Sequence, residues 1–467
     1  MSWFKWFYSV PLILGILVSI YSYKIKLTGF DIKKNSINYF ICIFFLLLIG
    51  YGEVITQSGD WFKHNAIFSE IFEQWNKPVI IEFKGQNYIL CYGLGFYMVP
   101  SWIAGLFDSY FLLRWLVLLN SAFGLFLIFK WIKKIWNLSI WYVIAIFFID
   151  RLDFLADLRW LLIEYDNFSE IWWHLVNFNS FDIIDQIPQH SLSIILVSLS
   201  IIYHLKNDCI NQLYIFQLFT FGIFWSPFFV FALLPFVLIV LFRIFKENKW
   251  IFSFHYISIF IVLFFILYYY SLHFKVDTFS IKWKNLRHFV YIMLFRFIPT
   301  YIVPIVFIYI LNFKINKLKI TDYTIILIMI IFSIIYTHIN YGFFNDFTDK
   351  TTLIVTFVLN IYLIYLIKHN YYQKRNIVLI FLIVISGIFM PFKMIASKYY
   401  VFSNEKLIKE HFYYTQLLKS NKSITLKNAM DIGYKIFKYP FIYQYLGMRD
   451  NNFNSIFKNC NKKNNKF

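Results

Sequence analysis

Residues 112–136 read "LLRWLVLLNSAFGLFLIFKWIKKIW". No charged side chain lies between Arg114 and Lys130, and three lysines, Lys130, Lys133 and Lys134, then follow within five residues. Such an apolar run approaches the roughly 20 residues that a helix needs to cross the hydrocarbon core of a bilayer. Cations that directly follow a span are typical of a loop on the cytoplasmic side. The stretch therefore predicts a transmembrane helix and its orientation.

The composition extends this interpretation to the whole chain. Of its 467 residues, 60% are hydrophobic, 23% are aromatic and only 15% are charged, against roughly 25% charged residues in a soluble domain. The four cysteines are scattered, without the spacing of a metal site or a disulfide framework. The net charge of +19 lies in short loops and in the C-terminal tail, so it does not indicate a nucleic-acid partner. We predict an all-α polytopic membrane protein.

Reading the apolar runs gives about twelve transmembrane helices, with a range of 11–13. The predicted spans are 7–23, 37–55, 110–129, 139–150, 188–205, 212–225, 228–242, 254–270, 290–311, 323–338, 352–367 and 377–392. Residues 1–392 would then form one transmembrane domain. Residues 393–467, which hold 14 Lys or Arg against 4 acids, form a basic C-terminal tail or a small outer domain.

The loops divide into two sets by their cation content. One set holds 17 Lys or Arg in 56 residues and comprises 24–36, 130–138, 206–211, 243–250, 312–322 and 368–376. The opposite set holds 10 in 123 residues and comprises 56–109, 151–187, 271–289 and 339–351. Cation-rich short loops stay in the cytoplasm, so the second, longer set faces outward. We expect a multi-pass protein of the inner (plasma) membrane whose chemistry lies on its outer, periplasmic face.

Residues 88–107, "YILCYGLGFYMVPSWIAGLF", allow two interpretations. They are long enough to span, but a span here would turn "KWIKKIW" outward, against the charge rule. Gly93, Gly95 and Pro100 also disfavour a straight helix. We favour a pair of short interfacial helices in the first outer loop, with Tyr92, Tyr97 and Trp102 at headgroup level.

The segment "SGDWFKHN", residues 58–65, places an acid, a base and an imidazole where the second span ends. Lys63 and His64 follow Asp60 by three and four residues, so one helical turn brings the three together. This grouping suits deprotonation of a hydroxyl beside an anionic leaving group. The alternative is structural, with Asp60 as the N-cap of an interfacial helix.

Other outer loops add polar groups. Asp150, Asp153 and Asp157 share one helical face, which is either a ligand set for a hard cation such as Mg²⁺ or an internally paired surface. Cations at the outer face could clamp a phosphate, or attract anionic lipid headgroups. The candidate residues at later helix ends and within the ninth span are Gln189, His190, Arg296, Asn345, Asp346 and Lys350.

Taken together, these features resemble the GT-C class of membrane glycosyltransferases, which take a sugar from a polyprenyl-phosphate carrier. Members of the class have an acid in the first large outer loop, then interfacial helices, then a span that begins with an arginine. Asp60 matches the acid, residues 88–107 match the interfacial helices, and Arg114 matches the arginine.

The chain is also similar, over nearly its whole length, to a group of bacterial multi-span membrane proteins of this type. The stretches that carry this similarity are "GDWFKHNAI" at 59–67, "YGLGFYMVP" at 92–100, "PQH" at 188–190, "NDFTDK" at 345–350 and "QYLG" at 444–447. Each of these motifs is short. Lys350 stands where the group's pattern has arginine.

The resemblance implies an inverting sugar transfer to a glycan, lipid or protein acceptor, in surface glycan assembly or modification. Asp60 would be the general base. Lys63, His64, Lys350 and Arg296 would contact phosphate, and Asn65, Gln189, His190, Asn345 and Asp346 would line the sugar or acceptor site. The class includes metal-dependent and metal-independent members, so a divalent cation, Mg²⁺ or Mn²⁺, is an optional cofactor. Partners would be the bilayer and the lipid-linked donor, with no nucleic acid.

Two other functions remain open at this level. A surface-polysaccharide polymerase or ligase also works on lipid-linked glycans outside the membrane, but tends to use arginines in large outer loops. A transporter or flippase for a lipid-linked glycan would often show a repeat between its halves and charges at the midplane. The sequence shows no such repeat.

Overall fold

A computed structural model describes twelve stretches of the chain and a few single positions. These are residues 32–53, 57, 61–83, 86–148, 184–185, 187–209, 211–247, 255–272, 281–283, 293–341, 347–370 and 446–448, with 10, 13–14, 16–17, 286 and 290. The described residues are mostly helical, as predicted. The spans predicted at 7–23, in large part, and at 377–392, entirely, lie outside the described residues.

Each of the other predicted spans coincides with a helix. These are α2 (Ile32–Ile49), α5 (Tyr110–Trp136), α6 (Ile140–Phe148), α10 (Pro188–Lys206), α11 (Gln212–Trp225), α12 (Phe229–Lys246), α13 (His255–Ser271), η3 (Met293–Ile302) continuing into α15 (Val303–Ile315), α16 (Ile320–Thr337) and α17 (Phe347–Asn370). Four of them, α5, α12, α16 and α17, are long and apolar enough to cross a membrane. The chain is therefore an α-helical, membrane-embedded protein. The number of twelve spans stays a prediction.

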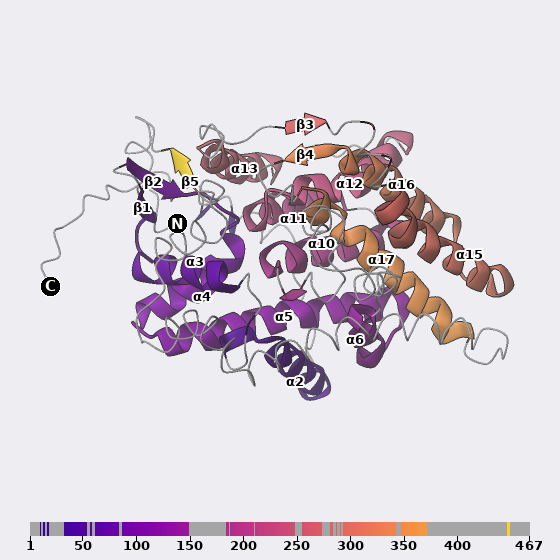
Figure 1. Ribbon diagram of the computed structural model, residues 1–467, viewed down its shortest axis with the longest axis horizontal. Coiled ribbons are helices and arrows are strands. Elements are labelled where there is room, and N and C mark those ends of the chain that lie inside the picture. Colours follow the sequence, from indigo (N-terminus) through magenta and orange to yellow (C-terminus); the bar gives the residue numbers. More distant parts are fainter. Residues whose placement is uncertain are drawn as a thin grey trace, which may run out of the picture.

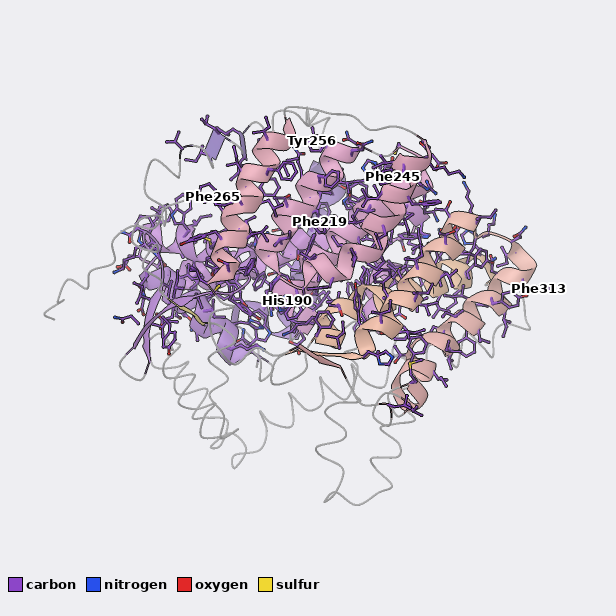
Figure 2. The ribbon with its side chains drawn as sticks, turned by 90° about the horizontal axis from the view of Figure 1, so that it is seen from above. His190, Phe219, Phe245, Tyr256, Phe265 and Phe313 are labelled. Carbon is purple, nitrogen blue, oxygen red and sulfur yellow. The ribbon has the colours of Figure 1, made fainter. Side chains whose placement is uncertain are left out.

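The helices pack around a buried centre formed by α10 and α17. Nearly every side chain of α10 is buried, and 94% of the apolar window of α17 is buried, against 44% for α5. The outer helices instead expose large apolar side chains, such as Phe111 at 71%, Phe242 at 69% and Phe313 at 76%. Soluble proteins rarely expose contiguous apolar surface of this extent, so we assign these faces to lipid. Figure 2 shows Phe245 and Phe313 at the periphery and His190 among the helices.

Polar contacts fasten one end of this assembly. The buried Asp322, in the first turn of α16, accepts from Lys206 Nζ at 2.6 Å and from Tyr362 Oη at 2.8 Å. Arg243 on α12 donates to the Leu205 carbonyl and to Asp208. These contacts join α10, α12, α16 and α17 at the end that carries Lys133, Lys134 and Lys368.

The first outer loop folds into two helices and a small sheet at the opposite end of α5 (Figure 1). Its elements are α3 (Trp61–Glu73), β1 (Ile80–Phe83), β2 (Gln86–Leu90) and α4 (Gly95–Leu106). β2 pairs antiparallel with β1 and with β5 (Leu446–Met448), so the "QYLG" segment of the tail lies beside this loop. A second strand pair joins β3 (Ile281–Trp283) to β4 (Ile339–Tyr341).

Residues 88–107 differ from the predicted pair of helices. Residues 88–90 belong to strand β2, and a single helix, α4, follows. Its 12 residues reach roughly 18 Å at 1.5 Å per residue, too short for a hydrocarbon core of roughly 30 Å. α4 packs against α3 and α5, with Trp102 43% exposed. Tyr92 and Tyr97, predicted at headgroup level, are instead buried.

The second predicted span also ends differently. α2 ends at Ile49, and a tight turn, η1 (Tyr51–Glu53), follows it. Gly50 and Gly52 have φ of 107° and 76°, which glycine adopts readily, and Glu53 has φ of 59°. Glu53 therefore lies in the loop after the helix, rather than inside a span that runs to residue 55.

Candidate functional site

The start of α3 is anchored by Trp61, directly after Asp60. The Trp61 indole is 1% exposed and donates from Nε1 to the Asp185 carbonyl at 2.8 Å. Its ring meets the Tyr51 ring edge-on, with centroids 4.6 Å apart. This contact fixes the directions in which Lys63, His64 and Asn65 leave the first turn of α3. Asp60 itself lies outside the described residues.

His64 points from α3 toward α4. Its Nδ1 lies 2.6 Å from the Tyr97 hydroxyl, and the two rings stack with centroids 5.9 Å apart. Both side chains are fully buried. A buried imidazole of this kind is normally held by a hydrogen bond, and here Tyr97 supplies it.

Gln189 and His190 occupy the first turn of α10, after Pro188 at its start. Gln189 Nε2 donates to the Tyr92 hydroxyl at 3.0 Å, and His190 Nε2 lies 3.4 Å from the same oxygen. His190 Nδ1 lies 2.7 Å from Ser226 Oγ, in the corner between α11 and α12. Tyr92 and Ser226 thereby hold the imidazole at both ring nitrogens.

Lys350 reaches the same place from α17. It is 8% exposed, and its Nζ lies 4.9 Å from the ring centre of Phe228, whose edge faces the His190 ring at 5.3 Å. On the other side, the rings of Tyr97 and Tyr92, with centroids 6.0 Å apart, link His64 to His190. Groups from α3, α10 and α17 therefore converge, and we call Lys63, His64, His190 and Lys350 the basic cluster.

One acceptor beside this cluster is unused. Gln189 is fully buried, and its Oε1 has no hydrogen-bond partner in the described part of the chain. A buried carbonyl without a donor costs about 1–3 kcal/mol. A ligand hydroxyl or N–H placed here would remove that penalty.

Asn65 does not join the basic cluster. Its Nδ2 donates to Gln57 Oε1 at 2.7 Å, and it lines a pocket between α3 and α5 together with Glu53, Tyr110 and Arg114. We call Glu53, Gln57, Asn65, Tyr110 and Arg114 the Glu53 pocket. Asn65 leaves α3 about 100° away from His64 and lines this pocket instead; its predicted place in a sugar or acceptor site stays a prediction.

In the Glu53 pocket an acid and an arginine meet. Arg114 Nε lies 2.6 Å from Glu53 Oε2, and Tyr110 donates its hydroxyl to Glu53 Oε1 at 3.3 Å. Burial raises the pKa of the Glu53 carboxyl above its usual range, although the Arg114 charge and the Tyr110 hydrogen bond act to lower the pKa. The spacing of the sequence did not reveal Glu53, because it falls within the predicted span 37–55.

Four of the predicted site residues, Asp60, Asn345, Asp346 and Arg296, cannot be placed with the rest. Asp60, Asn345 and Asp346 lie outside the described residues, as do Asp150, Asp153 and Asp157. The backbone of Arg296 belongs to η3, but its side chain is not described. Within the described stretches, no three His, Cys, Asp or Glu side chains gather as metal ligands would. A role for Mg²⁺ or Mn²⁺ stays an expectation.

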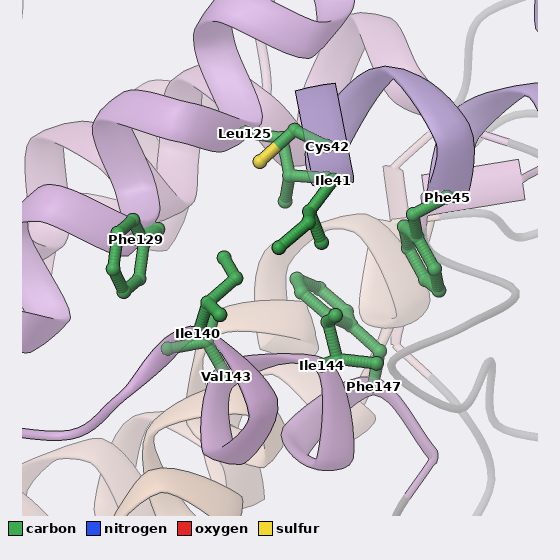
Figure 3. A pocket seen from close by; sticks show the side chains of 9 residues that line it. All are labelled: Ile41, Cys42, Phe45, Leu125, Phe129, Ile140, Val143, Ile144 and Phe147. Carbon is green, nitrogen blue, oxygen red and sulfur yellow. The ribbon is translucent and has the colours of Figure 1, made fainter. Parts of the chain in front are cut away.

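A second pocket, between α2, α5 and α6, has a different character. Figure 3 shows it lined by aliphatic and aromatic side chains, with the Cys42 sulfur as its single hetero atom. It offers no group for acid–base or phosphate chemistry. The polar sites beside α3 are therefore better candidates for chemistry than this apolar pocket.

The chain was compared with known proteins. No family model, no curated protein and no solved structure matches it. The likeness to GT-C glycosyltransferases stays a resemblance of short motifs, and the assignment of function has to rest on the site.

Sequence reasoning named Lys63, His64, Gln189, His190 and Lys350, and the fold brings all five together. It missed the residues that hold them, Tyr92, Tyr97, Ser226 and Phe228. The two tyrosines stand in the motif "YGLGFYMVP", but the motif does not show that their hydroxyls face inward. Ser226 and Phe228 stand in an apolar corner with no sequence signal for a site.

Proposed function

We propose that this chain is a membrane-embedded glycosyltransferase that moves a sugar from a polyprenyl-phosphate carrier to an acceptor hydroxyl. One observation carries the proposal. Two lysines and two histidines from three helices far apart in sequence converge beside an unused buried acceptor. A positive, mostly buried site of this kind favours a phosphate, and the lipid-facing helices suit a phosphate with an apolar tail.

The chemistry needs a base and a stabilised leaving group. In the proposed reaction, Asp60 takes the proton of the acceptor hydroxyl while that oxygen attacks the anomeric carbon. The bond from this carbon to the phosphate oxygen breaks, and the polyprenyl phosphate leaves with the bonding electron pair. Lys63 and Lys350 stabilise the added negative charge, and such charge stabilisation is often the largest single term in catalysis.

The remaining residues of the site have a positioning role. His64 and His190 are fully buried and are held by Tyr97, Tyr92 and Ser226, so they keep the surrounding groups of the site in place. Gln189 Oε1 accepts from a sugar hydroxyl. Arg296, Asn345 and Asp346 belong to the proposed donor or acceptor site by resemblance.

The test follows label from a panel of radiolabelled polyprenyl-phosphate sugars in membranes that carry the full-length protein. We expect transfer by the wild type, its loss in Asp60→Asn, and a loss of roughly 10²-fold or more in Lys350→Met, the effect typical of one lost charge-stabilising group. Lys77→Met, which changes an exposed lysine in the turn after α3, is the matched control and should retain activity.

Two outcomes would contradict the proposal. Full transfer by Asp60→Asn would remove the base. A Lys350→Met protein as active as Lys77→Met would remove the basic cluster from the reaction, and would favour a polymerase, a ligase or a flippase.

A further inference from the structure

The Glu53 pocket lies on the other flank of α3 from the basic cluster. His64 and Asn65 are adjacent in sequence, and adjacent residues leave a helix about 100° apart. His64 therefore faces Tyr97 on α4, while Asn65 faces Gln57. Trp61 and Phe68 complete the wall beside Asn65. The molecule thus has two polar sites, one on each side of the helix that begins after Asp60.

The pocket holds an unused donor, Gln57 Nε2, beside a buried ion pair. Glu53 Oε2, Gln57 Nε2 and Arg114 Nε are buried without a hydrogen-bond partner among the described residues. Arg114 Nε and Glu53 Oε2 are close enough for an ion pair, but they are not aligned as a hydrogen bond. Glu53 Oε2 and Arg114 Nε are partners of each other, and buried polar atoms are nearly always paired in folded proteins, so it is the Gln57 Nε2 donor beside this ion pair that points to a missing partner.

The charges indicate what that partner is. Glu53 and Arg114 balance each other, so the pocket has no net charge to attract an ion. A hydroxyl group can donate to Glu53 and at the same time accept from Gln57 or Arg114. The cavity admits little more than one water-sized group, which fits a single hydroxyl.

The backbone holds this arrangement in a fixed shape. Glu53 has φ of 59° and follows Gly52, whose φ is 76°. A non-glycine residue in this region is strained by about 1–3 kcal/mol, and such strain concentrates at functional sites. The Arg114 side chain lies over the Tyr110 ring at 5.1 Å and is 34% exposed, so this wall of the pocket is partly exposed.

We propose that the Glu53 pocket binds a hydroxyl group of a neutral, hydroxyl-bearing ligand such as a sugar or polyol. If the chain is the proposed glycosyltransferase, this ligand is the acceptor of the sugar. Only this identification rests on the proposed function. Glu53 then receives the hydrogen bond of an acceptor hydroxyl, and Gln57 and Arg114 donate to its oxygen.

The experiment measures melting temperatures of the full-length protein in lipid nanodiscs, which avoids detergents with sugar headgroups. The probes are methyl β-D-glucopyranoside, methyl α-D-mannopyranoside and methyl β-D-galactopyranoside, with inorganic phosphate as the ionic probe. Binding to the folded state raises the melting temperature in a concentration-dependent way. The variants are Glu53→Gln, Gln57→Leu, Lys350→Met and, as the matched control, the exposed Glu73→Gln on α3.

We expect at least one glycoside to stabilise the wild type and Glu73→Gln. In Glu53→Gln the concentration needed should rise about 10- to 100-fold, the effect of losing a hydrogen bond to a charged group. Gln57→Leu should weaken the response in the same direction. Phosphate should stabilise Glu53→Gln as it does the wild type, and should stabilise Lys350→Met less.

The two proposals fail separately. A wild type that no glycoside stabilises, or a Glu53→Gln variant that responds like Glu73→Gln, would overturn the hydroxyl site. A phosphate response that is unchanged in Lys350→Met would overturn the basic cluster as a phosphate site, and would leave the hydroxyl site standing if the glycoside response still depends on Glu53.

Discussion

At the scale of single residues, the decisive side chains are tyrosines whose rings are buried and whose hydroxyls each hold a histidine. Tyr97 holds His64, and Tyr92 holds His190 together with Gln189. In a membrane protein a tyrosine in a loop is first interpreted as a headgroup anchor, since its ring is apolar and its hydroxyl is polar. The same two properties suit a buried ring with a hydrogen-bond partner, so sequence alone does not separate the two cases.

The His64–Tyr97 contact can be tested by a double-mutant cycle. Tyr97→Phe removes the hydrogen bond between His64 Nδ1 and the Tyr97 hydroxyl in a buried place and should lower the free energy of unfolding by about 1–3 kcal/mol. His64→Phe combined with Tyr97→Phe should be less destabilising than the sum of the two single variants, because both polar partners are then absent. Denaturant titrations in mixed micelles give the four values.

The control for this cycle is Tyr309→Phe, because Tyr309 is 59% exposed on the lipid-facing side of α15. Removing the Tyr309 hydroxyl should leave the free energy of unfolding nearly unchanged. Additive losses in the double variant, or a Tyr97→Phe protein as stable as Tyr309→Phe, would show that the hydroxyl does not hold His64.

The candidate site was predictable in part, and the reason differs between residues. His64, Gln189, His190 and Lys350 could be named, because polar groups at the ends of apolar runs are costly and therefore conspicuous. Asn65 could be named but not placed, since its direction depends on where α3 begins. Glu53 could not be found, because the end of α2 depends on the backbone of Gly50 and Gly52 and not on hydropathy.

At the scale of elements, hydropathy predicted the helices and local hydrogen bonds determine their ends. α5 runs past its apolar core to Trp136, because Ser109 caps its start and Asn137, with φ of 55°, ends it. The strands were not predicted. β2 and β5 have only five and three residues and lie more than 350 positions apart, so neither hydrophobic periodicity nor a turn signal marks their pairing.

The β2–β5 pairing predicts a specific cross-link. Tyr88 and Met448 are directly opposite in the antiparallel register, and opposite residues have Cα atoms about 4.5–5.5 Å apart, within disulfide range. With the native cysteines replaced by serine, Tyr88→Cys with Met448→Cys should form a disulfide on mild oxidation. A protease digest analysed with and without reductant by mass spectrometry detects it.

The matched pair for this cross-link is Tyr88→Cys with Leu446→Cys. Leu446 lies opposite Leu90, two positions along the strand from Met448, so it is out of range and should stay reduced. Equal yields from the two pairs would show that the "QYLG" segment does not dock on β2 in this register.

At the scale of the whole molecule, the two ends carry different chemistry. One end holds the basic cluster, the Glu53 pocket and the small sheet that includes β5. The other holds ion pairs that fasten helices, Lys206 to Asp322 and Arg243 to Asp208. α17 connects them, with Lys350 at one end and Lys368 at the other. The predicted sidedness, in which polar loops face outward and basic turns face the cytoplasm, stays a prediction.

The sidedness is open to a direct measurement with a membrane-impermeant maleimide. Cys209 is exposed beyond the end of α10, whereas Cys42 and Cys91 are buried, so Cys209 reports the end that carries the fastening ion pairs. In a Cys460→Ser background it should be labelled in inverted membrane vesicles and protected in intact spheroplasts. Lys77→Cys in a Cys209→Ser, Cys460→Ser background should show the opposite pattern, because Lys77 is exposed at the end of the molecule that carries the basic cluster. If Cys209 and the cysteine at position 77 are both labelled from the same side, the two ends do not lie across a bilayer from each other. Labelling of each from the reversed side would put the basic cluster in the cytoplasm, where an outer-face acceptor could not reach it.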